Sequence, residues 1–177
     1  MLQEPISDRL ERLRQGCVLD GPTVVYTLWK DLLDFWFSNQ DNKVYLVTPF
    51  LDEDRLLEIF KSVLEHKSTA YLEAFYVRKK CCDGITKEVL FKKAEEKLTS
   101  KEKDLIKEKG IKLTETPKRF HAKFMACVNN GDAEVLVTSA NFQASHFEWN
   151  NLETVIFLTM TETEFKDRYL NAIAGDI

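Results

Sequence analysis

The sequence has few of the features from which several classes of protein are built. It contains four cysteines, none of them in a C-x2-C pair, so it predicts neither a disulfide framework nor a cysteine-bound metal. No apolar run approaches the roughly 20 residues that a membrane-spanning helix requires. The first fifteen residues are too polar for a secretory signal. We therefore expect a cytoplasmic or nuclear protein.

Internal repeats and low-complexity linkers are also missing. The 177 residues suit one domain with a substantial core. Their composition, 44% hydrophobic and 31% charged, is that of an ordinary globular protein. We expect a single domain over residues 1–177, with helices in residues 1–42.

The first half of the chain has the pattern of a strand, a helix and a second strand. Residues 44–48 form a short apolar run, the acidic residues 52–54 suit a helix N-terminus, and residues 70–77 predict a second strand. Apolar residues at helical spacing also predict a helix over residues 24–38. A strand–helix–strand order favours parallel strands. We therefore expect an α/β fold with a mixed, largely parallel sheet and helices on both faces.

Positive charge is concentrated in the middle of the chain. Residues 78–123 contain 15 Lys and Arg against 8 Asp and Glu, although the whole chain has a net charge of −4. Residues 78–110 read as a basic insertion with two polar helices. They suit either a solvated helical hairpin with i,i+4 salt bridges or an electropositive rim that collects a polyanion. The candidate substrate-binding residues are Arg78, Lys79, Lys80, Lys118 and Arg119.

The region after this insertion predicts a β-hairpin. Residues 124–128 and 135–138 are mostly apolar, as expected for two strands of a core. Between them, Asn130 and Gly131 supply the positive φ values that a two-residue type I′ turn requires.

Polar side chains gather at the open end of this hairpin. Alternation along the first strand places His121 and Lys123 on one face, and Ser139 and Asn141 come just past the second strand. An imidazole can attack an electrophile, while an ammonium, a hydroxyl and an amide can hold a phosphate through its transition state. Glu153 can accept a hydrogen bond from Nδ1 of His121 and leave Nε2 free to react.

The spacing of these residues resembles the HKD motif of the phospholipase D superfamily. That motif has H-x-K, then an Asp, then G-S-x-N, and a glutamate further on. Here Val128 stands where the Asp is expected and Thr138 replaces the Gly, and the stretch is a few residues longer. The tyrosyl-DNA phosphodiesterase branch also lacks the Asp. The matching residues are His121-x-Lys123, Ser139-x-Asn141 and Asn151-x-Glu153.

The resemblance implies a phospholipase D-like fold and a metal-independent phosphodiesterase that needs no cofactor. His121 would form a phosphohistidine, Lys123 and Asn141 would hold the non-bridging oxygens with support from Ser139, and Glu153 would orient His121. The basic segment favours a nucleic-acid backbone as substrate, so we expect a nuclease. Two alternatives stay open: a catalytically silent scaffold for protein contacts, and a phospholipase.

The mechanism needs a second histidine to protonate the leaving oxygen. The chain has three histidines, and only His121 belongs to an H-x-K motif. We therefore expect a homodimer in which a twofold-related copy completes the site. His146 is a local alternative, but it lacks its own Lys and Asn. We expect the interface to include the hairpin and the 142–151 loop, with apolar anchors at Phe142, Phe147 and Trp149.

Overall fold

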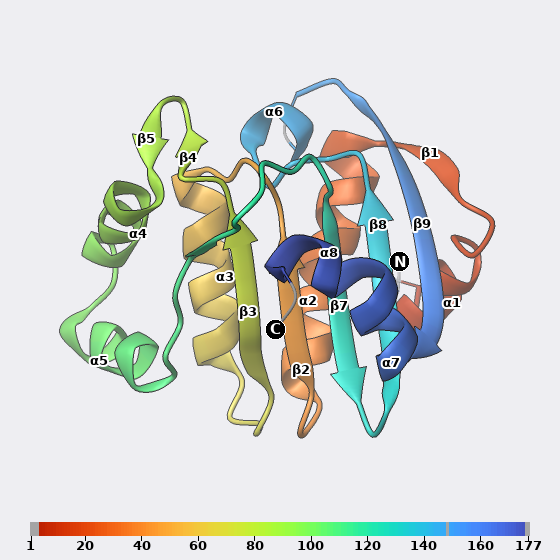
Figure 1. Cartoon of the computed structure of the whole chain (residues 1–177), viewed down its shortest axis with the longest axis horizontal. Helices are drawn as coiled ribbons and strands as arrows, with labels where there is room; N and C mark the ends of the chain where they lie inside the picture. The colour runs from red at the N-terminus through yellow and green to blue at the C-terminus, as the bar shows by residue number, and fades with distance from the viewer. Residues whose placement is uncertain (1–3, 148, 176–177) are drawn as a thin grey trace.

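A seven-stranded sheet forms the centre of the protein, in a computed structural model that describes residues 4–147 and 149–175 (Figure 1). The strand order is β1-β9-β8-β7-β2-β3-β6. In the described part of the chain, no helix is long and apolar enough to cross a membrane. The strands are β1 (Cys17–Asp20), β2 (Lys43–Val47), β3 (Tyr71–Val77), β6 (Thr114–Glu115), β7 (Phe124–Asn129), β8 (Asp132–Thr138) and β9 (Leu152–Thr161).

The expectation of a largely parallel sheet is only partly met. Strand β3 is parallel to both β2 and β6, as the strand–helix–strand pattern predicted. The pairings β2–β7, β7–β8, β8–β9 and β1–β9 are antiparallel. For neighbours in sequence the connection decides the direction, because a tight turn reverses the chain between β7 and β8, whereas a helix carries it back between the parallel strands β2 and β3. Strand β1 was not predicted, and residues 1–42 are therefore not purely helical.

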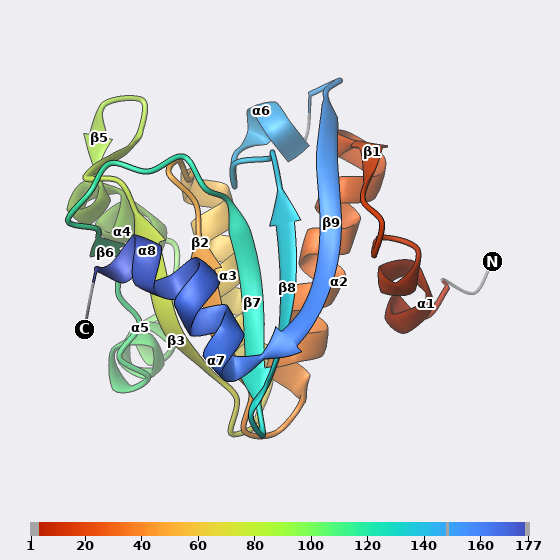
Figure 2. The same ribbon diagram turned by 45° about the vertical axis from the view of Figure 1, so that its right-hand side comes forward.

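Helices cover both faces of the sheet, as expected from the sequence (Figure 2). One face packs against α2 (Tyr26–Ser38) and α3 (Glu53–Glu65), which Asp52 caps as the acidic run predicted. The other face is covered by the C-terminal helical segment α7 (Glu162–Phe165), η2 (Lys166–Leu170) and α8 (Asn171–Ala174). Alternation along β2 serves both faces: Val44 and Leu46 pack beneath α2 and α3, while Tyr45 and Val47 pack beneath the C-terminal segment.

Some helical details differ from the sequence pattern. The first helix, α1 (Ile6–Glu11), has Pro5 as its N-cap. A π-helical turn, η1 (Gly21–Val25), leads into α2, on which Phe35 is 41% exposed rather than buried. In the C-terminal segment Phe165, Leu170 and Ile173 are buried, whereas Ala172 is exposed.

The middle segment contains the two predicted helices, α4 (Lys87–Glu96) and α5 (Ser100–Glu108). A small hairpin that the sequence did not reveal, β4 (Lys80–Cys82) with β5 (Ile85–Thr86), precedes them. Among the described residues, no ion pair within the middle segment is of the expected i,i+4 kind. Instead, the Lys97 ammonium lies 2.8 Å from the Glu53 carboxylate and 3.1 Å from that of Asp54, so it ties the segment to the start of α3.

The β7–β8 hairpin has the predicted two-residue turn. Asn130 and Gly131 have φ values of 50° and 86°, as a type I′ turn requires. His121 and Lys123 precede β7 rather than belonging to it, but the Thr138 amide still donates to the Lys123 carbonyl at 3.1 Å. The hairpin register therefore holds up to the polar residues at its open end.

Candidate functional site

The polar residues singled out in the sequence meet at one end of the sheet, at the top in Figure 1. His121 and Lys123 precede β7, Ser139 and Asn141 follow β8, and Glu153 is the second residue of β9. They share one end because β7, β8 and β9 are successive antiparallel neighbours. The Ser139 amide donates to the Thr154 carbonyl at 3.0 Å and fixes β8 against β9 at this point.

The two motif residues before β7 are accessible. His121 is exposed, and Lys123 is half-buried with its Nζ donating to the His121 carbonyl at 2.8 Å. Asn141 and Glu153 are buried, at 8% and 3% exposure. The arrangement thus combines an open imidazole with a buried amide and carboxylate.

The carboxylate of Glu153 does not hold His121, and that expectation is wrong. Oε1 accepts hydrogen bonds from Nδ1 of His146 at 2.5 Å and from the Asn151 amide at 2.6 Å. Oε2 accepts from the Ser139 hydroxyl. The reason is that the loop between β8 and β9 folds back over the strand ends and brings its own imidazole to the carboxylate.

His146 also contacts the amide of Asn141. It lies in the short helix α6 (Ala144–Phe147), and its Nε2 is 3.2 Å from Nδ2 of Asn141. The donor and acceptor in this contact depend on the tautomer of His146, since Nε2 accepts when the ring proton is on Nδ1 and donates when Nε2 carries a proton. The other amide atom of Asn141, Oδ1, is buried without a hydrogen-bond partner among the described residues. Sequence reasoning gave His146 only as an alternative, yet the structure joins it to two site residues.

The backbone of the loop that carries His146 contacts Asp52 and Gly21. The Ala144 amide donates to the Asp52 side chain at 2.6 Å, and the Asp52 amide donates to the Phe142 carbonyl at 3.0 Å. Gly21 approaches so closely that a Cβ there would lie 2.3 Å from the carbonyl oxygen of His146. These contacts fix the loop backbone, so the position of the imidazole is built into the fold.

Two of the three apolar anchors expected at a dimer interface lie in the core instead. Phe142 and Phe147 are 0% and 1% exposed, with ring centroids 5.5 Å and 5.1 Å from that of Trp29. Only Trp149, at 66% exposure, is free to contact a partner. The apolar residues of this loop therefore anchor it to the sheet's helical layer.

A basic groove of about 460 Å³ opens next to the motif, and its lining extends to Arg119, two residues before His121. It forms where the chain leaves the parallel neighbours β3 and β6, so segments distant in sequence share its walls. The structure brings all five candidate substrate-binding residues into this lining, together with one carboxylate, Glu115. The lining residues are Phe50, Arg78, Lys79, Lys80, Glu115, Thr116, Pro117, Lys118 and Arg119.

Arg78 connects the groove to the histidine. Its guanidinium donates to the Phe120 carbonyl from Nε at 2.9 Å and from Nη2 at 2.5 Å, and it lies 4.8 Å from the ring centroid of Phe50. The positive charge of Arg78, with desolvation and the charges of Lys123 and Arg119, lowers the pKa of His121. Burial and the charge of Arg78 lower the pKa of Lys123. The site thus favours a neutral imidazole at His121.

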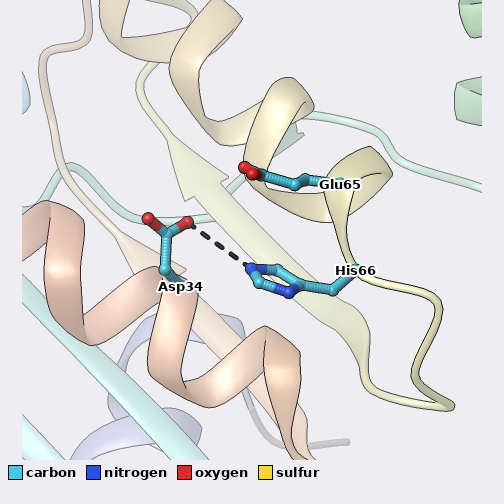
Figure 3. A group of neighbouring side chains, drawn as sticks. All are labelled: Asp34, Glu65 and His66. Atoms are coloured by element: carbon cyan, nitrogen blue, oxygen red, sulfur yellow. Dashed lines mark ion pairs between the residues drawn. The ribbon is translucent and has the colours of Figure 1, made fainter.

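A second titratable cluster lies at the other end of the sheet. Asp34 of α2 and the residues Glu65 and His66 bring ligand atoms within 4.8 Å of one another (Figure 3). Nε2 of His66 is 3.7 Å from the Asp34 carboxylate. These donors are of the types that bind Zn²⁺, and sequence spacing missed them because they come from two helices. The cluster lies far from the groove and is partly exposed, so it takes no part in the candidate site.

Comparison with known proteins identifies the fold. No family model matches the chain, and neither does any curated protein. Among solved structures, Nuc from Salmonella typhimurium, a phospholipase D family member, matches at 14% identity with a TM-score of 0.50, over 89% of this chain and 91% of Nuc. Polyphosphate kinase from Porphyromonas gingivalis matches at 13% identity and a TM-score of 0.60, and this chain spans 28% of the kinase.

The chain therefore has the phospholipase D fold, as the resemblance implied.

Proposed function

We propose that the protein is a metal-independent phosphodiesterase that cleaves a nucleic-acid backbone through a phosphohistidine on His121. One observation carries this proposal: an exposed imidazole lies beside a groove lined by five cationic side chains and one carboxylate. Such a lining attracts a polyanion and leaves its phosphates next to a nucleophile.

The electrostatics of His121 support a nucleophilic role. An imidazole attacks phosphorus through a neutral nitrogen, so a group that favours the neutral form increases the reactive fraction near neutral pH. The positive charges of Arg78, Lys123 and Arg119 have this effect, because they lower the pKa of His121. The same cations oppose the negative charge that develops on the phosphoryl oxygens.

Lys123 and Asn141 would hold the non-bridging oxygens. Lys123 already hydrogen-bonds to the backbone of His121, so its ammonium lies close to the nucleophile. The Asn141 amide contacts His146, and its Nδ2 can donate to a phosphate oxygen. Ser139 would support the site through its hydrogen bond to Glu153.

A nucleic-acid substrate fits the groove better than a lipid headgroup. The ion pairs between described residues include none of the five cations, so their charge is available to several phosphates. A chain of phosphates uses such a row of charges, whereas one headgroup uses one or two.

The proposal is tested by hydrolysis of single-stranded DNA and RNA in the presence of excess EDTA. We expect turnover by the wild type, none by His121→Asn, and full activity for the matched control His66→Asn. Acid-labile and alkali-stable ³²P on the wild-type chain would identify the phosphohistidine. Absence of turnover on both nucleic acids would overturn the proposal. Hydrolysis of phospholipid vesicles alone would favour the phospholipase alternative, and inactivity on all substrates the silent scaffold.

The homodimer expected from the sequence stays a prediction. Its argument rested on the need for a second histidine. The burial of Phe142 and Phe147 removes two of the contacts proposed for its interface.

A further inference from the structure

The proposed reaction requires a second proton-transfer group. Once Nε2 of His121 is bonded to phosphorus, that imidazole cannot also protonate the leaving oxygen. A separate acid must do so, and the same group can afterwards take a proton from the attacking water. From the sequence we inferred that a second copy of the chain supplies this group.

The structure offers a source within one chain. His146 is held at Nδ1 by the buried carboxylate of Glu153, at 2.5 Å, while its Nε2 is 3.2 Å from Nδ2 of Asn141. One ring nitrogen is thus fixed by an acid, and the other is directed at the amide that would bind the phosphate. This is the arrangement by which a carboxylate orients a catalytic imidazole and stabilises its charged form.

We propose that His146 is the general acid and base of the reaction, so that one chain contains a complete active site. The inference rests on the proposed function. His66, the remaining histidine, pairs with Asp34 at the C-terminal end of α3, whereas Asp52 at the other end of that helix holds the loop of the candidate site.

Burial and access agree with this role. The Glu153 side chain is 4% exposed, and its three hydrogen bonds hold the carboxylate in one orientation. The His146 side chain keeps 24% of its surface exposed, so a substrate can contact the ring. A phosphate oxygen that binds the Asn141 amide brings the ester oxygens of the same phosphorus close to Nε2 of His146.

The two steps balance in atoms and charge. In the first, the P–N bond to His121 forms, the P–O bond to the leaving group breaks, and His146, protonated on both ring nitrogens, gives its Nε2 proton to the leaving oxygen. In the second, neutral His146 takes a proton from water, the hydroxide attacks phosphorus, and the P–N bond breaks. Glu153 keeps its negative charge throughout and acts as a positioning residue.

The test compares two substrates that differ in leaving group. Cleavage of an oligonucleotide releases a sugar alkoxide, which needs the acid, whereas thymidine 5′-p-nitrophenyl phosphate releases p-nitrophenolate, which does not. For His146→Asn we expect turnover of the oligonucleotide to fall about 10²- to 10⁴-fold. On the nitrophenyl ester the variant should release a burst of about one p-nitrophenolate per chain and then stall, because water is no longer activated.

Controls separate this role from a structural one. His121→Asn should give no burst, and His66→Asn should behave as wild type on both substrates. The variant His146→Gln keeps a donor for Glu153, and it should show the same burst if His146→Asn folds poorly. Equal losses on the two substrates by folded variants, or wild-type turnover of the oligonucleotide, would overturn the inference.

Mixing identifies the source of the acid. Chains with His121→Asn and chains with His146→Asn should not restore activity when combined, because neither has both imidazoles. Restored activity would show that a partner copy supplies His146. If substitution of His146 left activity unchanged, the role of acid and base would return to His121 of a partner copy. A wild type that hydrolyses neither substrate would instead overturn the proposed function itself.

Discussion

Nδ1 of His146 and Oε1 of Glu153 lie 2.5 Å apart, so a buried carboxylate at the start of β9 holds an imidazole from the loop between β8 and β9. This pairing replaces the contact between Glu153 and His121 that the sequence predicted. It leaves His121 among positive charges, of which that of Arg78 contributes most to lowering its pKa. The two imidazoles of the site therefore have different environments, as a nucleophile and an acid–base group require.

We predict that the acidic limb of activity moves when the cations near His121 are removed. Neutral His121 is the reactive form, so kcat/KM rises with pH through its pKa. Arg78 and Arg119 lower that pKa, so Arg78→Gln and Arg119→Gln should raise it toward the ordinary value of about 6.5. The limb should move to higher pH in both variants. Proton NMR titration of the His121 ring and a pH–rate profile measure the change, with Arg168→Gln as control.

The groove cations should control affinity for nucleic acid. For Lys118→Gln and Lys80→Gln we expect weaker binding of single-stranded DNA or RNA at low salt. Each variant should also reduce the slope of log K against log salt by about 0.7, since one counterion contact is lost. Fluorescence anisotropy over a salt series provides the measurement. Lys109→Gln, beyond α5, should change neither quantity, and equal effects of all three variants would show that the groove is not the binding surface.

Gly21 should be needed for the position of His146. Its backbone amide donates to the Asn151 carbonyl at 2.8 Å, and an added methyl group would meet the carbonyl oxygen of His146 at 2.3 Å. We expect Gly21→Ala to lower the free energy of unfolding by about 1–3 kcal/mol and to reduce kcat. Urea unfolding and turnover assays measure the two effects. Gly84→Ala, which has open space but a φ of +83°, should lower stability without reducing kcat.

Restoring the motif Asp should damage the protein. Val128 is 1% exposed and belongs to the apolar cluster beneath the C-terminal helical segment. A carboxylate there would be buried without a partner, so Val128→Asp should lower the free energy of unfolding by more than about 2 kcal/mol. Val18→Asp, on a strand but 62% exposed, is the matched control. Stability and activity equal to wild type for Val128→Asp would show that the site tolerates the motif residue.

The sequence by itself determined the elements whose signals are local. The Asn130-Gly131 turn and the helix that Asp52 caps each depend on a few neighbouring residues. The H-x-K and S-x-N pairs were also visible, because a short hairpin fixes their spacing. Even the five groove cations could be named from their positions along the chain.

Only the tertiary structure decided which of these groups meet. The groove exists because β3 and β6 are parallel neighbours, which places residues 78–80 beside residues 115–119. Glu153 pairs with His146 because Phe142 and Phe147 pack into the core and turn the loop back over the strand ends. Such contacts depend on the free energy of packing distant segments together, and a local pattern of residues does not predict this free energy.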